Sequence, residues 1–124
     1  MFELDGLDHV ALTVRDVERA AAWYVEVLGF ERRFPGMWDG VPTFVGLGLT
    51  AIALFPAKDN ESSPRRGAMI EHVALRASRQ NFAVAQARLQ SLGVAFEFQD
   101  HEISHSIYFQ DHDGNQLEIT TYEV

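Results

Sequence analysis

The stretch Asp8-His9-Val10-Ala11-Leu12 recurs half a chain length later as Glu71-His72-Val73-Ala74-Leu75. In both copies large apolar residues alternate with small or polar ones, which is the two-residue period of a β-strand. Self-similarity over such a distance indicates two copies of one supersecondary unit. The fold of the chain therefore follows from what comes after each copy.

The same order of elements is expected after each copy. Asp16 is a helix N-cap, and Gly29 stands where a left-handed residue ends that helix. In the second half the helical spacing of Phe82, Ala85 and Leu89 marks a helix that Gly93 ends. The strands expected around these helices are 7–14, 30–34, 43–47 and 51–55 in the first half, and 70–77, 94–99, 104–110 and 116–122 in the second.

Both halves are thus predicted to be βαβββ modules of an α+β fold. Each helix packs on one face of its sheet and leaves the other face open, so two modules side by side predict an open, cup-shaped mixed sheet with the helices outside. The segment 58–67 is polar and lacks periodicity, which is typical of a surface connection. We expect a single domain over 1–124, with module 1 at 1–57, the linker at 58–67 and module 2 at 68–124.

Composition excludes several classes of function. The formal net charge is −8, which disfavours binding to nucleic acids and to anionic membrane surfaces. The chain contains no cysteine, so thiolate catalysis and cysteine-ligated zinc are excluded. No signal-peptide pattern and no span-length apolar stretch occur in the sequence, and we expect a cytoplasmic protein.

Strand alternation predicts which side chains share the open face. Val10 and Leu12 must face the helix, so His9 points the other way, and the same argument applies to His72. In the last two strands the alternation sends Ile107, Phe109, Leu117 and Ile119 to the helix side, and Ser106, Tyr108, Gln110, Glu118 and Thr120 to the open side.

Two histidines and one carboxylate on this face form a predicted metal site. His9, His72 and Glu118 together suit Fe(II), Mn(II), Ni(II) or Zn(II). Three protein ligands leave coordination positions open for water, substrate or dioxygen, which favours a catalytic role. Small neighbours, such as Ala74 and Ser106, leave space for a small-molecule ligand.

These motifs resemble the vicinal oxygen chelate superfamily, which includes glyoxalase I, extradiol dioxygenases, and fosfomycin- and bleomycin-resistance proteins. The resemblance rests on both copies of the repeat, on residues 23–30 at the end of the first predicted helix, and on the segment 108–118. It implies that paired βαβββ modules form a cup whose metal is held by His9, His72 and Glu118. It also implies a small-molecule substrate and a homodimer.

Among the branches, the extradiol dioxygenases fit best. Their signature is matched in order by His101, Ile107, Tyr108, Asp111, Gly114 and Glu118, although His112 replaces a proline. Glyoxalase I needs a fourth ligand where Ala53 stands, and the fosfomycin enzymes place a threonine where Ala11 stands. The resemblance therefore implies a dioxygenase-like oxidoreductase with Fe(II) or Mn(II); a lyase or isomerase with Ni(II) or Zn(II) is one alternative.

Catalysis of this kind needs a titratable group near the metal, and imidazole has a suitable pKa. His101 and His105 are both candidates, and His101 is preferred for its match to the signature, with Tyr108 as a hydrogen-bond donor. The remaining alternative is a metal-independent module of the bleomycin-resistance type, which sequesters a ligand in an acidic cleft. In either case Met37 and Trp38 are candidates for an apolar wall.

Overall fold

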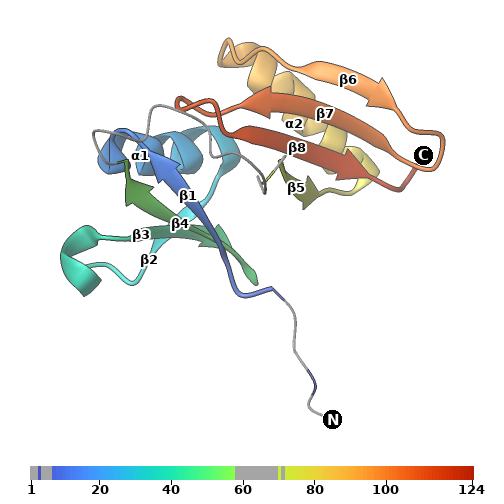
Figure 1. Ribbon diagram of the computed structural model, residues 1–124. Helices are drawn as coiled ribbons and strands as arrows, with labels where there is room; N and C mark the ends of the chain where they lie inside the picture. Colours follow the sequence, from blue (N-terminus) through green and yellow to red (C-terminus); the bar gives the residue numbers. More distant parts are fainter. Residues whose placement is uncertain (1–2, 4–6, 58–69, 71) are drawn as a thin grey trace. The chain divides into compact units, whose positions relative to one another are not determined.

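The computed structural model describes residues 3, 7–57, 70 and 72–124, and the expected linker 58–67 lies outside them. The chain divides into two compact units, Met1–Ser63 and Pro64–Val124. Each unit contains one four-stranded mixed sheet and one α-helix, in the order β-α-β-β-β (Figure 1). The predicted α+β fold of tandem βαβββ modules is confirmed. No helix among the described residues is long and apolar enough to cross a membrane.

The first unit has the strand order β1-β4-β3-β2. Its first strand runs parallel to its last strand, and the other pairs are antiparallel. Leu12, Val45 and Leu54 lie buried on the side of the sheet that faces the helix. The elements are β1 (Val10–Val14), α1 (Val17–Leu28), β2 (Glu31–Arg33), the 3-10 helix η1 (Met37–Gly40), β3 (Thr43–Leu47) and β4 (Thr50–Pro56).

The second unit repeats this topology with the order β5-β8-β7-β6. Again the first and last strands are parallel and the remaining pairs antiparallel. Its core contains Phe82 and Leu89 from the helix against Ile107 and Leu117 from the sheet. The elements are β5 (Val73–Arg76), α2 (Arg79–Ser91), β6 (Glu97–Asp100), β7 (His105–Gln110) and β8 (Gln116–Thr121).

The strands that follow the helices are shorter than the sequence predicted. The backbone N–H of Phe30 donates to Tyr24 O, and that of Val94 donates to Leu89 O. These hydrogen bonds tie the residues after each helix back to its last turn. The backbone N–H groups of Phe30 and Val94 are therefore not available for pairing with a neighbouring strand. As a result β2 begins at Glu31 and β6 at Glu97, rather than at 30 and 94.

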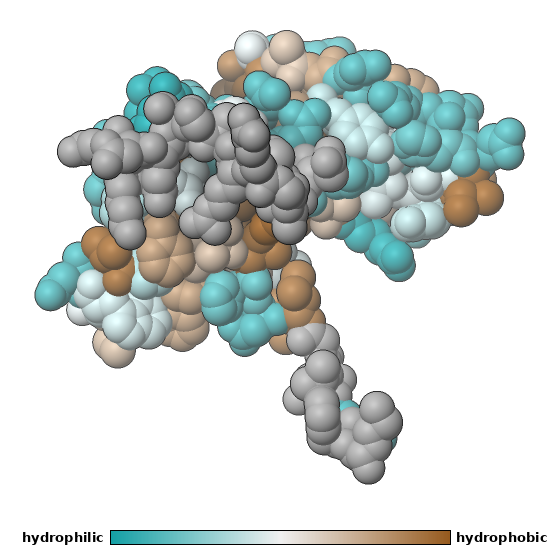
Figure 2. All heavy atoms as spheres, in the orientation of Figure 1, coloured by the Kyte–Doolittle hydropathy of each residue, from teal (hydrophilic) through white to brown (hydrophobic). Residues whose placement is uncertain are grey.

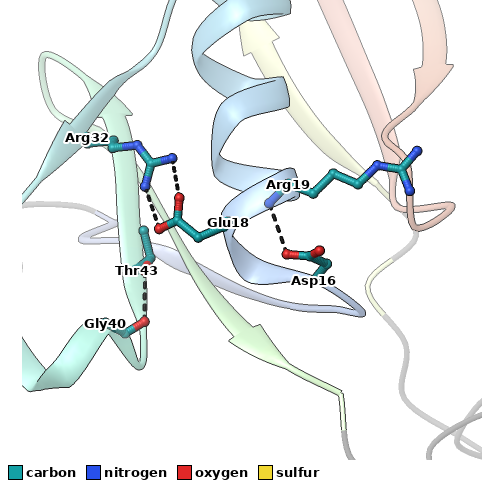
Figure 3. A network of polar contacts seen from close by, with 6 residues as sticks. All are labelled: Asp16, Glu18, Arg19, Arg32, Gly40 and Thr43. Carbon is teal, nitrogen blue, oxygen red and sulfur yellow. Dashed lines mark hydrogen bonds and ion pairs between the residues drawn. The ribbon is translucent and has the colours of Figure 1, made fainter.

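Polar contacts fix how α1 meets the sheet (Figure 3). Asp16 Oδ1 accepts a hydrogen bond from the backbone N–H of Arg19 at 3.1 Å, as an N-cap does. One turn into the helix, the Glu18 carboxylate receives two hydrogen bonds from the Arg32 guanidinium of β2, at 2.8 and 3.0 Å. Both side chains are solvent-exposed, so this pair contributes orientation more than stability.

We predict that Asp16→Ala lowers the free energy of unfolding by about 1 kcal/mol, because the first turn of α1 loses its cap. Asp16→Asn serves as the matched control, since asparagine caps helices as well as aspartate does. Urea denaturation followed by circular dichroism measures both. Equal stability of the alanine and asparagine variants would contradict this role of Asp16.

Candidate metal centre

The second unit brings His72 and Glu118 together on the open face of its sheet. His72 immediately precedes β5, and Glu118 lies on the parallel neighbour β8, directly beside Ala74. His72 Nε2 is 3.0 Å from Glu118 Oε2. Ala74 has no side chain beyond Cβ, so the imidazole can reach the carboxylate across it.

The Glu118 carboxylate is held in place from its other side. Ser106 Oγ, on β7, donates to Glu118 Oε1 at 2.7 Å and lies 3.0 Å from Thr120 Oγ1. Thr120 in turn donates to the backbone carbonyl of His105. Ser106 and Glu118 are both buried, which makes this hydrogen bond strong and the carboxylate orientation well defined. From the sequence, Ser106 was expected only to leave space for a ligand; its contact with Glu118 depends on the register of β7 against β8.

Tyr108 and His101 extend this cluster. Tyr108 is the register partner of Glu118 in the β7–β8 pair, and its ring meets the His72 ring edge to face at 5.9 Å. The Tyr108 hydroxyl lies 3.0 Å from His101 Nε2. A chain of contacting polar groups therefore runs from His101 through Tyr108 to Glu118 and His72.

Burial raises the pKa of the Tyr108 phenol above its usual value of 10.0. The negative charge of Glu118 and a hydrogen bond to that carboxylate raise the pKa further, and a hydrogen bond with Ser106 opposes them. Since a raised pKa favours the protonated form of an acid, Tyr108 remains a neutral hydroxyl donor at neutral pH and into the alkaline range.

His105 lies on the opposite side of the sheet from this cluster. As the first residue of β7 it alternates with Ser106, so it shares the helix side with Ile107. Its Nε2 is 3.6 Å from Asp100 Oδ1, and its ring contacts the Phe98 ring at 5.3 Å. Of the two histidines that the sequence left open, only His101 contacts Tyr108.

The first unit carries the third predicted ligand, His9, immediately before β1. His9 Nδ1 lies 2.7 Å from Asp8 Oδ2, and this contact leaves Nε2 as the nitrogen for a metal. The His9 ring packs edge to face on Phe44 at 5.2 Å. Within each unit, no three described His, Asp and Glu side chains lie close enough to form a metal site on their own.

The open faces of the two units hold different residues at equivalent positions. Register pairs Ala53 with both Ala11 and Phe44, as it pairs Glu118 with Ala74 and Tyr108. Ala53 is thus the counterpart of Glu118, and it supplies no fourth ligand. Phe44 is the counterpart of Tyr108, and each ring packs against the histidine of its own unit.

Phe44 belongs to an aromatic cluster of the first unit, formed with Phe34 and Trp38. The three rings are mutually in contact, with centroids 5.4 to 5.8 Å apart. Phe34 and Trp38 are about half exposed, and both adopt positive φ angles that non-glycine residues rarely take. Brown and pale spheres in Figure 2 gather over the part of this unit where Figure 1 places η1 and β3. Trp38, one of the two residues expected to form an apolar wall, therefore belongs to an exposed aromatic surface of the first unit.

We predict that Glu118→Gln lowers the pKa of Tyr108 in the metal-free protein, because the substitution removes the neighbouring negative charge. Glu97→Gln is the matched control: Glu97 is the register partner of Tyr108 on β6 but contributes nothing to its shift. Titration followed by ¹³C NMR of labelled tyrosine measures the pKa. An unchanged pKa in Glu118→Gln would contradict the electrostatic coupling.

Comparison with known proteins places these features in a family. The sequence model described as Glyoxalase/Bleomycin resistance protein/Dioxygenase superfamily matches residues 6–119. Catechol-2,3-dioxygenase of Bacillus subtilis (strain 168) is 29% identical over 118 residues, which are 91% of this chain and 40% of that protein. Glutathione transferase FosA of Serratia marcescens is 25% identical over 116 residues, 94% of this chain and 80% of that protein.

Solved structures share the fold. The crystal structure of lactoylglutathione lyase from Agrobacterium tumefaciens superimposes with a TM-score of 0.75 at 23% identity. The match covers 97% of this chain and 96% of the lyase. The chain spans less than half the length of the catechol dioxygenase that it matches. The named activities of the dioxygenase, the glutathione transferase and the lyase differ from one another.

Proposed function

Because the chain belongs to the Glyoxalase/Bleomycin resistance protein/Dioxygenase superfamily, we propose that it is a metal-dependent enzyme that cleaves a catechol-like substrate as extradiol dioxygenases do. The observation that carries this proposal is the buried Glu118 carboxylate with His72 at 3.0 Å, adjoined by Tyr108 and His101. A catechol dioxygenase of Bacillus subtilis is among the sequence relatives, which supports this proposal.

The donor atoms of the second unit suit a divalent metal. Two ligands at right angles around a metal, with bond lengths of about 2.1 Å, lie about 3 Å apart, and His72 Nε2 and Glu118 Oε2 have that spacing. In our proposal His9 supplies the third ligand through Nε2. Fe(II) or Mn(II) bound there would hold two substrate oxygens and leave a position for dioxygen.

The remaining side chains of the cluster orient the Glu118 carboxylate, donate a hydrogen bond and transfer a proton. Ser106 holds one oxygen of Glu118, so the other oxygen keeps a fixed direction. Tyr108 stays protonated, and in this scheme its hydroxyl exchanges its hydrogen bond to Glu118 for one to a substrate oxygen. His101, in contact with the Tyr108 hydroxyl, accepts the proton that the substrate hydroxyl releases and returns it later in the reaction. His105 has no part in this scheme, because it lies on the helix side.

The metal content of the purified protein tests this proposal. We expect about one equivalent of Fe or Mn per chain in protein purified anaerobically, measured by elemental analysis. Glu118→Ala and His72→Ala should lose this metal, whereas His105→Ala should keep it. The wild type should consume dioxygen with catechol and yield a ring-opened product that contains both oxygen atoms, detected by mass spectrometry.

Other results would redirect the assignment. Bound Ni or Zn without oxygen uptake would favour a lyase or isomerase. Tight metal binding that survives in both alanine variants would reject the ligand set.

A homodimer is part of the proposal by analogy with the superfamily, and light scattering tests it independently of activity.

A metal-independent binding protein is the second candidate, favoured by the half-exposed aromatic cluster of Phe34, Trp38 and Phe44. Such a protein would bind an aromatic ligand by stacking. Trp38 is half exposed while Trp23 is buried, so ligand binding should quench Trp38 fluorescence selectively. For this candidate we expect quenching by an aromatic cation to be unchanged by a chelator and absent in Trp38→Phe. Sensitivity to the chelator would reject it.

A further inference from the structure

We propose that Arg76 binds an anionic group, a carboxylate, on the substrate of the open face of the second unit. This inference rests on the proposed function and specifies its substrate class: a catechol-like ring that carries a carboxylate. Neither the metal ligands nor the proton carriers described above include this residue.

Strand register puts Arg76 on the same face as Glu118. Strand β5 pairs in parallel with β8 (Figure 1). In that pair Ala74 lies beside Glu118, and Arg76 lies beside Thr120. Two residues along a strand span about 6.6 Å. Arg76 is therefore one pair of open-face residues away from Glu118, and along β5 only the methyl group of Ala74 separates Arg76 from His72 on this face.

The Arg76 guanidinium is held in position by an aromatic ring. Its central carbon lies 4.9 Å from the centroid of the Tyr122 ring, in a cation–π arrangement. No hydrogen bond joins the Arg76 guanidinium to another residue in the described part of the chain. The N–H donors that recognise carboxylates are therefore available to a ligand.

No carboxylate in the described part of the chain neutralises Arg76. Glu123 follows Tyr122 directly, but its Oε2 accepts a hydrogen bond from the backbone N–H of Arg79 at the start of α2. Arg76 is also the only Lys or Arg on a described strand of the second unit. In a chain of net charge −8, it is the group on this face that can attract an anion.

The chemistry of the ligand follows from the groups at the two ends of this open face: His72 and Glu118 at one end, and Arg76 at the other. One end presents His72 and Glu118, which the proposed function assigns to chelation of two adjacent oxygens through the metal. The other end presents a guanidinium, which pairs with a carboxylate through two parallel hydrogen bonds. A benzene ring with hydroxyls on one side and a carboxylate on the other carries both features across its width.

The test compares 3,4-dihydroxybenzoate with catechol, which lacks the carboxylate. Dissociation constants are measured by calorimetry under anaerobic conditions for the wild type, Arg76→Gln and Arg79→Gln. We expect Arg76→Gln to weaken binding of 3,4-dihydroxybenzoate about tenfold, the usual size of a charge-assisted hydrogen bond's loss, and to leave catechol binding unchanged. Arg79→Gln removes the same charge three residues away, at the start of α2, and should change neither constant.

Tyr122 is a positioning residue in this account, and two variants examine it. Tyr122→Phe keeps the ring and should bind 3,4-dihydroxybenzoate like the wild type. Tyr122→Leu removes the ring, so it should weaken this binding and broaden the Nε–Hε signal of Arg76 in an NMR spectrum. Equal effects of the two substitutions would reject the positioning role.

Benzoate separates this inference from the proposed function, because it lacks the chelating oxygens. In the wild type, benzoate should shift the Arg76 Nε–Hε signal saturably, with or without metal. If benzoate binds at Arg76 but catechol is never oxidised, the anion site stands and the dioxygenase assignment is rejected. If catechol is oxidised but Arg76→Gln leaves the preference for 3,4-dihydroxybenzoate unchanged, the anion site is rejected and the dioxygenase assignment stands.

Discussion

The parallel pairing of the first and last strand in each unit is the constraint on which the site depends. Because these strands are parallel, the residue that precedes β5 lies level with the start of β8. His72 can therefore meet Glu118 although 45 intervening residues form the helix and two other strands. A parallel pair needs a long crossover, which α2 supplies while it buries the apolar side of the same strands. The packing that builds the core of the unit thus also sets the spacing of the donor atoms.

The internal duplication gives one backbone frame two chemically distinct faces. Equivalent register positions hold Glu118 and Tyr108 in the second unit, and Ala53 and Phe44 in the first. On the open face, the histidine that precedes the first strand and the alanine two residues after it are kept in both units. The second unit consequently concentrates hydrogen-bonding and ionisable groups, while the first presents aromatic rings.

Strand alternation was sufficient to predict the face of most site residues from sequence. The two-residue period assigned His72, Tyr108 and Glu118 to one side, and the observed register agrees. The choice between His101 and His105 was open because it depends on where β7 begins. The strand begins at His105, so that side chain takes the parity of Ile107 and faces the helix side. Had the strand begun after His105, alternation would not have assigned its side chain to either face.

Contacts between side chains were harder to predict than faces. The hydrogen bond from Ser106 to Glu118 requires the register of β7 against β8, which the hairpin turn sets and which hydrophobic periodicity does not specify. The cation–π contact of Arg76 and Tyr122 depends likewise on the β5–β8 pairing of residues far apart in the chain. Both contacts act on groups whose identity the sequence already gives, and they determine how those groups are oriented.

Orientation is the property that matters most for a site on an open sheet face. A carboxylate there would ordinarily rotate and exchange partners with water, at a cost in ordering whenever a ligand binds. Burial of Glu118, with one oxygen fixed by Ser106, removes that freedom before any ligand arrives. Tyr108 benefits from the same arrangement, since burial and the fixed carboxylate both raise the pKa of its hydroxyl and keep its proton in place. The second unit is in this sense preorganised by its own polar network, independently of what it binds.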